Sequence, residues 1–131
     1  MTTRNGGVSQ GPYARWNLAT HVGDADNAVS INRALLREIV PVKPLWLNQV
    51  HGTDVVDAAV ANSTPDADAS FTRRAGSACV IMTADCLPVL FCDRDGSVVA
   101  AAHAISLGAS SVRKFILRFP AVCAGSGAMI S

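Results

Sequence analysis

The stretch MTADCLPVLFCDRDGSVVAAAH (residues 82–103) decides the fold class of this 131-residue chain. It contains two apolar runs, residues 87–93 and 97–103, separated by a short segment that includes Asp95-Gly96. An Asp-Gly pair between two such runs predicts a β-hairpin. Nearly every position of the first run is apolar, so we expect both faces of its strand to be covered. The stretch therefore predicts paired strands inside a layered structure.

Further short apolar runs extend the predicted sheet. Residues 44–50, 54–60 and 77–83 are rich in residues that favour strands, and a tight turn or short loop is expected between the first two. Residues 62–70 are typical of a loop. Residues 1–25 are polar and rich in glycine, which is typical of a loop or a short hairpin.

Residues 24–40 predict a helix, because apolar side chains recur there at helical spacing. Either Asp24 or Asp26 is expected as the N-cap, and prolines end the helix. The expected apolar face consists of Ala28, Ile31, Leu35 and Ile39. One helix together with several apolar strands predicts the α/β or α+β class with a layered sheet.

The composition excludes several classes of function. Half of the residues are apolar and 16% are charged, so the chain is expected to fold as one globular domain. A net charge of +1 and an aromatic content of 5% give no reason to expect nucleic acid or a membrane surface as a partner. Because the sequence shows neither an apolar leader nor an uninterrupted membrane span, we expect a cytoplasmic location, in which cysteines stay free or act as ligands.

Cys86 and His103 are the first candidate functional residues. In the predicted hairpin the end of the second strand returns beside the start of the first, which brings these two residues together. Strand alternation places His103 on the same face as Val99 and Ala101. A histidine at the end of such an apolar strand needs a polar partner or water.

Three interpretations of this pair stay open on spacing alone. The pair can be a small buried thiol beside a strand-end histidine that meets water. It can be a thiol nucleophile at Cys86 that His103 activates, as in cysteine hydrolases. It can also join His51, from the stretch LNQVHGTDVV (residues 47–56), in a His/Cys/His site. Zinc accepts such ligands, and three of them leave the open position that a catalytic site requires.

Four ordered blocks of the sequence carry a family resemblance: RNGGVSQGPYARWNLATHVGDADNAVSINRALL, WLNQVHGTDVV, PDADASFT and TADCLPVLFCDRDGSVVAAAHA. Together they span residues 4–104 and resemble the laccase-domain family, also called multicopper polyphenol oxidoreductases. Members of that family are understood as zinc-dependent purine nucleoside phosphorylases and adenosine deaminases. The resemblance implies a layered mixed β-sheet sandwich flanked by helices, similar to the fold of a bacterial toxin deamidase.

The resemblance also implies which residues bind the metal. In the family, the histidine of Q-V-H-G, the cysteine of T-A-D-C-x-P and the histidine of A-x-H-A are ligands. They match His51, Cys86 and His103, which places Cys86 and His103 at the catalytic centre. Zinc is the implied ion, since a multicopper oxidase needs more than the three histidines of this chain. A single blue-copper centre, with Met82 as its weak axial ligand, is a less favoured alternative.

The first block implies contacts to the substrate. Arg4, Asn17 and Asp24 match positions near the family's pocket, which implies contacts to phosphate or nucleoside. From the residues alone, Asn17 and Asp24 fit turn and N-cap roles equally well, and Arg4 fits a solvated surface charge. The implied reactions are phosphorolysis of adenosine, inosine, guanosine and methylthioadenosine, and deamination of adenosine. The implied partners are a purine nucleoside and phosphate, and a homodimer is compatible with the resemblance.

The resemblance ends at Ala104. The family continues with a Gly-Trp-Arg-Gly loop, whereas residues 105–131 contain neither that loop nor any acidic residue. We therefore expect residues 1–104 to be the N-terminal part of a laccase-domain fold. The remainder is expected to be an atypical tail, produced by truncation or a frame shift, that impairs turnover. The alternatives are a cysteine hydrolase or deamidase that uses Cys86 and His103, and an inactive metal-binding fragment.

Overall fold

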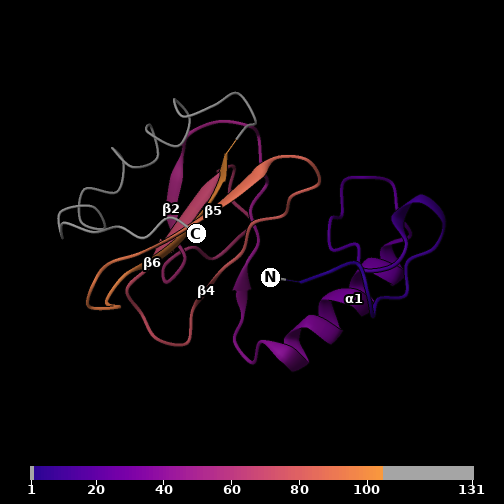
Figure 1. Cartoon of the computed structure of the whole chain (residues 1–131), viewed down its shortest axis with the longest axis horizontal. Helices are drawn as coiled ribbons and strands as arrows, with labels where there is room; N and C mark the ends of the chain where they lie inside the picture. The colour runs from indigo at the N-terminus through magenta and orange to yellow at the C-terminus, as the bar shows by residue number, and fades with distance from the viewer. Residues whose placement is uncertain (1, 105–131) are drawn as a thin grey trace. The chain divides into compact units, whose positions relative to one another are not determined.

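The computed structural model describes residues 2–104 of the chain, so the expected atypical tail lies outside the described residues. The chain divides into two compact units at the boundary between Lys43 and Pro44 (Figure 1). The first, called here the N-terminal unit, contains the 3-10 helix η1 (Gly11–Tyr13) and the helix α1 (Asp26–Ile39). The second, called here the sheet unit, contains all the strands of the described residues.

Helix α1 confirms the predicted helix, which ends before the prolines as expected. Its first turn differs from the prediction, because the helix begins at Asp26 after Ala25, whose side chain makes no capping hydrogen bond. The predicted capping by Asp24 or Asp26 is therefore wrong. The carboxylate of Asp24 instead accepts hydrogen bonds from the hydroxyl of Ser9 and the side-chain amide of Asn17, which lie in the loop before the helix.

The buried face of α1 consists of Val29, Asn32 and Leu36. Ile31 and Ile39, which the apolar spacing places on the core face, are 46% and 68% exposed. The predicted face is therefore wrong. The reason is that a polar residue, Asn32, lies in the middle of the buried face, and hydrophobic spacing cannot detect it.

Asn32 ties helix α1 to the loop that precedes it. Its Oδ1 accepts a hydrogen bond from the backbone N–H of Val8 at 2.8 Å. Its Nδ2 donates to Ser9 Oγ and to the carbonyl oxygens of Arg15 and Asn17, at 2.8 to 3.2 Å. Because a buried amide is stable only with its partners in place, Asn32 fixes the path of this loop.

Up to residue 104 the sheet unit holds two sheets, and the smaller consists of β1 (Pro44–Leu45) paired in parallel with β4 (Ala78–Cys79). The larger sheet has the order β2-β3-β6-β5, with bounds Val55–Asp57, Ala69–Thr72, Val99–Ala104 and Leu87–Cys92 respectively. Strands β2 and β3 are parallel, whereas β6 is antiparallel to both of its neighbours. The predicted α/β class with a mixed sheet is confirmed.

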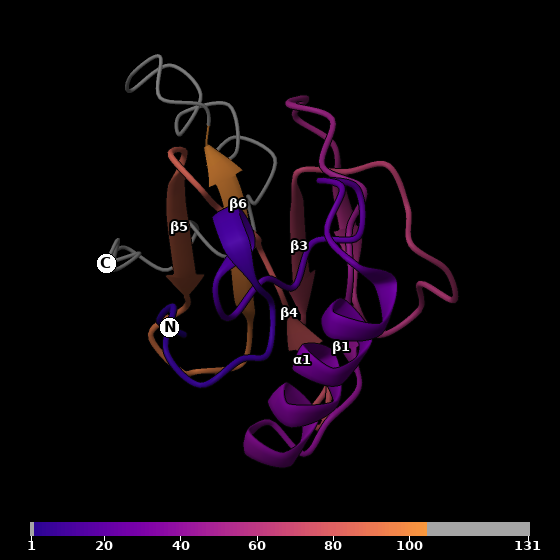
Figure 2. The ribbon, with the colours of Figure 1, turned by 90° about the vertical axis from the view of Figure 1, so that its right-hand side faces the viewer.

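Strands β5 and β6 form the predicted hairpin (Figure 2). Gly96 in its turn has a φ of 67°, a left-handed conformation that glycine adopts without strain. Strand β5 lies at the edge of the sheet, and Leu87 and Leu90 are 57% and 48% exposed. The expectation that both faces of this strand are covered is therefore wrong. The edge position also explains why Pro88 is tolerated within a strand.

The main core lies on one face of the four-stranded sheet. Its buried residues are Ala69, Val89, Phe91, Val98, Ala100, Ala102 and Ala104. Because successive side chains of a strand point to opposite faces, His103 lies on the other face with Val99 and Ala101, as predicted. The small side chains of β6 thus separate the apolar core from the face that carries the histidine.

Two parts of the sheet unit differ from the prediction. The sequence predicts residues 44–50 and 54–60 as successive strands joined by a short loop, but β1 and β2 pair in different sheets. Strand β3 begins at Ala69, inside the segment predicted as a loop. Strand β1 pairs in parallel with β4, and β3 pairs in parallel with β2. Parallel partners are not joined by a tight turn, so no local turn signal predicts either pairing.

Candidate metal site

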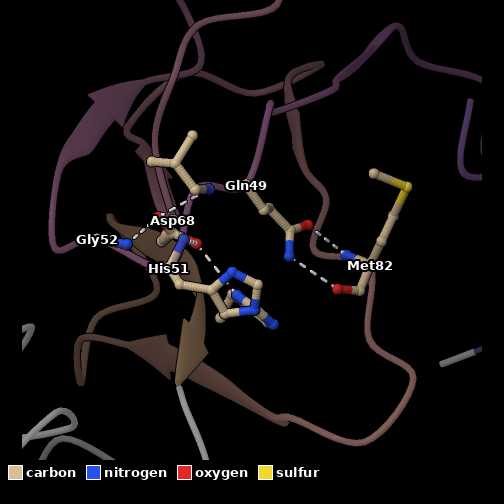
Figure 3. A network of polar contacts seen from close by, with 7 residues as sticks. Gln49, His51, Gly52, Asp68 and Met82 are labelled. Atoms are coloured by element: carbon tan, nitrogen blue, oxygen red, sulfur yellow. Dashed lines mark hydrogen bonds and ion pairs between the residues drawn. The ribbon is translucent and has the colours of Figure 1, made fainter. Parts of the chain in front are cut away.

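His51 lies in the loop between β1 and β2, with a φ of 59°. This left-handed conformation is rare for residues other than glycine and costs on the order of 1–3 kcal/mol. The carboxylate of Asp68 holds it by accepting hydrogen bonds from three successive backbone amides, Val50 (3.2 Å), His51 (3.0 Å) and Gly52 (2.6 Å) (Figure 3). The backbone that carries the exposed His51 side chain is therefore fixed.

His103 lies near the end of β6 and is 4% exposed. Its Nδ1 lies 3.1 Å from Asp68 Oδ1, and its backbone N–H donates to the carbonyl oxygen of Asp68 at 2.7 Å. A ring nitrogen that donates to a carboxylate leaves the opposite nitrogen, Nε2, with a lone pair for a metal or a proton. The rings of His51 and His103 lie edge to face, with centroids 5.0 Å apart.

Cys86 lies directly before β5 and carries a free, half-buried thiol. The segment before it is fixed by Gln49, whose side-chain amide donates to the carbonyl oxygen of Met82 and accepts from its N–H, both at 2.8 Å (Figure 3). This pair of hydrogen bonds imitates one step of a β-ladder. Gln49 thereby links the segment that carries His51 to the segment that carries Cys86.

The structure brings together the three residues expected to bind a metal. One ligand atom from each of His51, Cys86 and His103 lies within 4.8 Å of the other two. Bonds of about 2.0–2.3 Å place the ligand atoms of a tetrahedral zinc site about 3.3–3.8 Å apart, so small side-chain rotations would close the trio around an ion. Two imidazoles and one thiolate are ligands that zinc and copper accept. The trio can therefore hold a metal ion, and a set of three protein ligands would leave one position of a tetrahedral site for water or substrate.

The charges around the trio also suit a divalent cation. Metal binding requires a thiolate and neutral imidazoles, so a bound ion would meet one negative charge from Cys86 and none from the two histidines. Asp68 is 0% exposed and reaches the trio through the ring of His103. Histidines that bind metals commonly donate their second ring N–H to such a carboxylate. The donor set and its neighbour therefore match what a divalent ion requires.

The other expected site residues lie in the N-terminal unit and form hydrogen bonds within it. Arg4 donates from Nε and Nη2 to the carbonyl oxygen of Ala14, at 3.1 and 2.7 Å. Hydrogen bonds from Ser9 and Asn17 hold the pKa of the Asp24 carboxyl below its ordinary value. These contacts fit the structural roles that the sequence left open. Contact of Arg4, Asn17 and Asp24 with a substrate stays a prediction.

Reasoning from the sequence missed Asp68 and Gln49, although both lie in the quoted blocks. Asp68 offered no clear signal, because the sequence predicts its segment as a loop, whereas it stands between two alanines directly before β3. An acidic residue in such a place is buried only with strong hydrogen-bond partners. Gln49 offered no signal, because its partner is the backbone of a residue 33 positions away.

Comparisons with known proteins identify the family. Residues 1–114 match the family described as multi-copper polyphenol oxidoreductase laccase. A purine nucleoside phosphorylase of Pseudomonas aeruginosa is 55% identical over 104 residues, which cover 79% of this chain and 43% of that protein. The purine nucleoside phosphorylase YfiH of Escherichia coli is 50% identical over 106 residues, which cover 79% of this chain and 44% of that protein. A crystal structure of a Neisseria meningitidis protein matches with a TM-score of 0.82 and 53% identity, over 89% of this chain and 50% of that chain.

The chain spans about half the length, or less, of these three relatives. Their names therefore describe longer proteins. Within residues 2–104, no helix is both long and apolar enough to cross a membrane. The family match covers most of the chain. The Neisseria meningitidis protein has the same fold and is 53% identical in sequence. The resemblance carried by the four sequence blocks is thus confirmed, and this chain belongs to the multi-copper polyphenol oxidoreductase laccase family.

Proposed function

We propose that this chain carries the metal site of a zinc-dependent purine nucleoside phosphorylase that also deaminates adenosine. The observation that carries the proposal is the meeting of His51, Cys86 and His103, whose ligand atoms lie within 4.8 Å of one another. The names of the relatives support a purine nucleoside and phosphate as substrates. The proposed nucleosides are adenosine, inosine, guanosine and methylthioadenosine.

A zinc ion at this site would supply a Lewis acid that activates water or polarises a substrate oxygen. Among the chain's own residues, Asp68 keeps the ring of His103 oriented, and the exposed His51 leaves the trio accessible. Phosphorolysis also needs a cation that holds phosphate in line with the ribose C1′. Arg4, which matches a position near the family's pocket, stays the candidate for that role, and its Nε and Nη2 donate to the carbonyl oxygen of Ala14.

Zinc is proposed rather than copper, although the family's description names copper. The chain has three histidines, and His21, the one outside the trio, lies in the N-terminal unit. A multicopper cluster needs more histidine ligands than this chain supplies. The mixed nitrogen and sulfur donor set with an open position is typical of catalytic zinc.

One observation favours a second function, that of a cysteine hydrolase or deamidase. Asp68 orients His103, and His103 lies beside Cys86. These three residues therefore also have the order of a carboxylate, a base and a thiol nucleophile. In this function the thiolate of Cys86 attacks a carbonyl carbon, and His51 has no required role. His51 thus separates the two functions.

Metal analysis of the full 131-residue chain tests the proposal. We expect stoichiometric zinc in the wild type, and its loss in His51→Ala, Cys86→Ala and His103→Ala. His21→Ala and Cys92→Ala are matched controls, because they remove the same kinds of side chain outside the trio. Zinc retained by all three variants of the trio would contradict the proposed site. A zinc-free wild type that is alkylated selectively at Cys86 would favour the hydrolase.

Activity is measured with adenosine and inosine, in the presence and absence of phosphate. Phosphate-dependent release of the free base supports phosphorolysis, and release of ammonia from adenosine supports deamination. Zinc binding without turnover supports the inactive metal-binding fragment that the sequence left as an alternative. The cytoplasmic location and the homodimer stay predictions.

A further inference from the structure

We infer that Asp68 is the positioning residue of the proposed metal site, because its one carboxylate fixes the two histidine ligands relative to each other. The inference rests on the proposed site formed by His51, Cys86 and His103. Asp68 acts on His103 through the imidazole ring and on His51 through the backbone. It is not one of the three residues whose ligand atoms converge.

Each carboxylate oxygen of Asp68 accepts two hydrogen bonds. Oδ1 accepts from the backbone N–H of His51 at 3.0 Å and from His103 Nδ1 at 3.1 Å. Oδ2 accepts from the backbone N–H groups of Val50 at 3.2 Å and Gly52 at 2.6 Å. An ionised carboxylate has about four lone-pair sites, so its accepting capacity is fully used. The single atom Oδ1 thus joins the two histidines through two hydrogen bonds.

Burial makes these hydrogen bonds effective constraints. Asp68 is 0% exposed and His103 is 4% exposed, so water cannot readily replace a missing partner. The position of the carboxylate is itself fixed by the sheet, because Asp68 directly precedes β3 and its carbonyl oxygen accepts from the N–H of His103 in β6. The larger sheet therefore sets the distance between the carboxylate and the ring that it orients.

The two histidines depend on Asp68 in different ways. Without the carboxylate, the loop around His51 loses three hydrogen bonds that hold its left-handed backbone, and its imidazole would move as the backbone relaxes. His103 would lose the acceptor that keeps its proton on Nδ1. The proton could then move to Nε2, and a protonated Nε2 cannot bind a metal. One substitution should therefore disturb two ligands at once.

The variant Asp68→Asn separates this role from general charge effects. It keeps the shape of the side chain, but its amide nitrogen donates where an oxygen accepted, so two of the four hydrogen bonds are lost. Asp66→Asn is the matched control. Asp66 is an exposed carboxylate two positions earlier that accepts a hydrogen bond from Asn48 Nδ2 at 2.6 Å.

Zinc affinity and the visible spectrum of the cobalt(II) form, both measured on the full chain, test the inference. We expect Asp66→Asn to behave like the wild type, and Asp68→Asn to bind zinc about 10–100-fold more weakly with a changed cobalt spectrum. Unchanged affinity and spectrum in Asp68→Asn would overturn the inference and leave the metal site standing. A wild type that binds no zinc would overturn the metal site itself, and the inference with it.

A second measurement on the wild type covers the case in which Asp68→Asn does not fold. Long-range proton–nitrogen NMR of the metal-free full chain reports which ring nitrogen of His103 carries the proton, with the signal assigned from His103→Ala. The spectrum is recorded at a pH at which the nitrogen shifts of the ring show the neutral form. We expect the Nδ1–H tautomer. An Nε2–H tautomer or an even mixture would overturn the positioning role.

Discussion

Gln49 and Met82 form two reciprocal hydrogen bonds, each 2.8 Å long, across 33 positions of the sequence. In a β-ladder both partners of such a pair are backbone groups, whereas here a side-chain amide supplies one donor and one acceptor. The pair connects the loop of His51 to the segment that leads to Cys86. The spacing between two of the three proposed ligands therefore depends on one glutamine side chain.

Gln49→Ala should lower the free energy of unfolding by about 1–3 kcal/mol, because the backbone N–H and C=O of Met82 lose their partners. It should also weaken zinc binding. Urea unfolding followed by circular dichroism measures the first effect. The control is Gln10→Ala, since Gln10 is exposed and makes one side-chain hydrogen bond, to the carbonyl oxygen of Val8 at 3.3 Å. Equal losses in the two variants would contradict the role given to Gln49.

His51→Gly should be more stable than His51→Ala by about 1 kcal/mol, although both variants remove the imidazole. The reason is the φ of 59° at this position, which glycine adopts freely and alanine does not. Thermal unfolding of the full chain compares the two. The control position is Val50, an exposed neighbour whose backbone is outside the left-handed region. At this position the alanine variant is expected to be more stable than the glycine variant. If alanine is the more stable substitution at both positions, the backbone of His51 is not held as described.

Asn32→Ala should lower the free energy of unfolding by about 2–4 kcal/mol, because it removes the partner of several buried polar groups. Asn27→Ala is the control from the same helix. Asn27 is exposed in the first turn, so its loss should change the stability by about 0.5 kcal/mol or less. A similar, small effect of both variants would show that Asn32 does not anchor the loop.

The stability of the β5–β6 hairpin should depend on pH in the acid range, because of the carboxyl group of Asp93. A hydrogen bond from the Ser97 hydroxyl, with a further one from the Val98 N–H, holds the pKa of the Asp93 carboxyl below its ordinary value. A group with a lowered folded pKa contributes stability above its ordinary pKa and loses it as the pH falls through the folded pKa. The stability advantage of the wild type over Asp93→Asn should therefore shrink in that acid range.

Urea unfolding at a series of pH values, from neutral to acid, measures this dependence. Asp95→Asn serves as the control, because it makes the same change of charge in the same turn. A difference between the wild type and Asp93→Asn that stays constant across the acid range would exclude the proposed contribution of the carboxylate.

The parts of this protein that the sequence predicts well depend on local signals. The Asp-Gly turn predicts the β5–β6 hairpin, and the hairpin by itself predicts that Cys86 and His103 approach each other. Prolines correctly mark the end of α1, since they cannot continue a helix. Spacing alone leaves His51 as one possible third ligand, and the family resemblance is what favours it, because it lies on a separate loop with no metal-binding spacing to Cys86.

The parts that the sequence does not predict depend on hydrogen bonds between distant residues. The buried face of α1 was missed because its central residue, Asn32, is polar and finds its hydrogen-bond partners 15 to 24 positions earlier, in the loop that precedes the helix. Strand β3 was missed because its partner β2 pairs in parallel without a connecting turn. Asp68 was missed for the same reason, since its partners lie 16 to 35 positions away.

The hydrogen bonds at Asp68 have a consequence for how an ion would be exchanged. They restrict the loop of His51 and the ring of His103 through protein atoms alone. These ligands therefore lose conformational freedom when the chain folds, before any ion binds. In this respect the sheet unit differs from a zinc finger, which unfolds when a chelator removes its metal. Treatment with a chelator should leave the circular dichroism spectrum unchanged, and added zinc should bind again without a refolding phase.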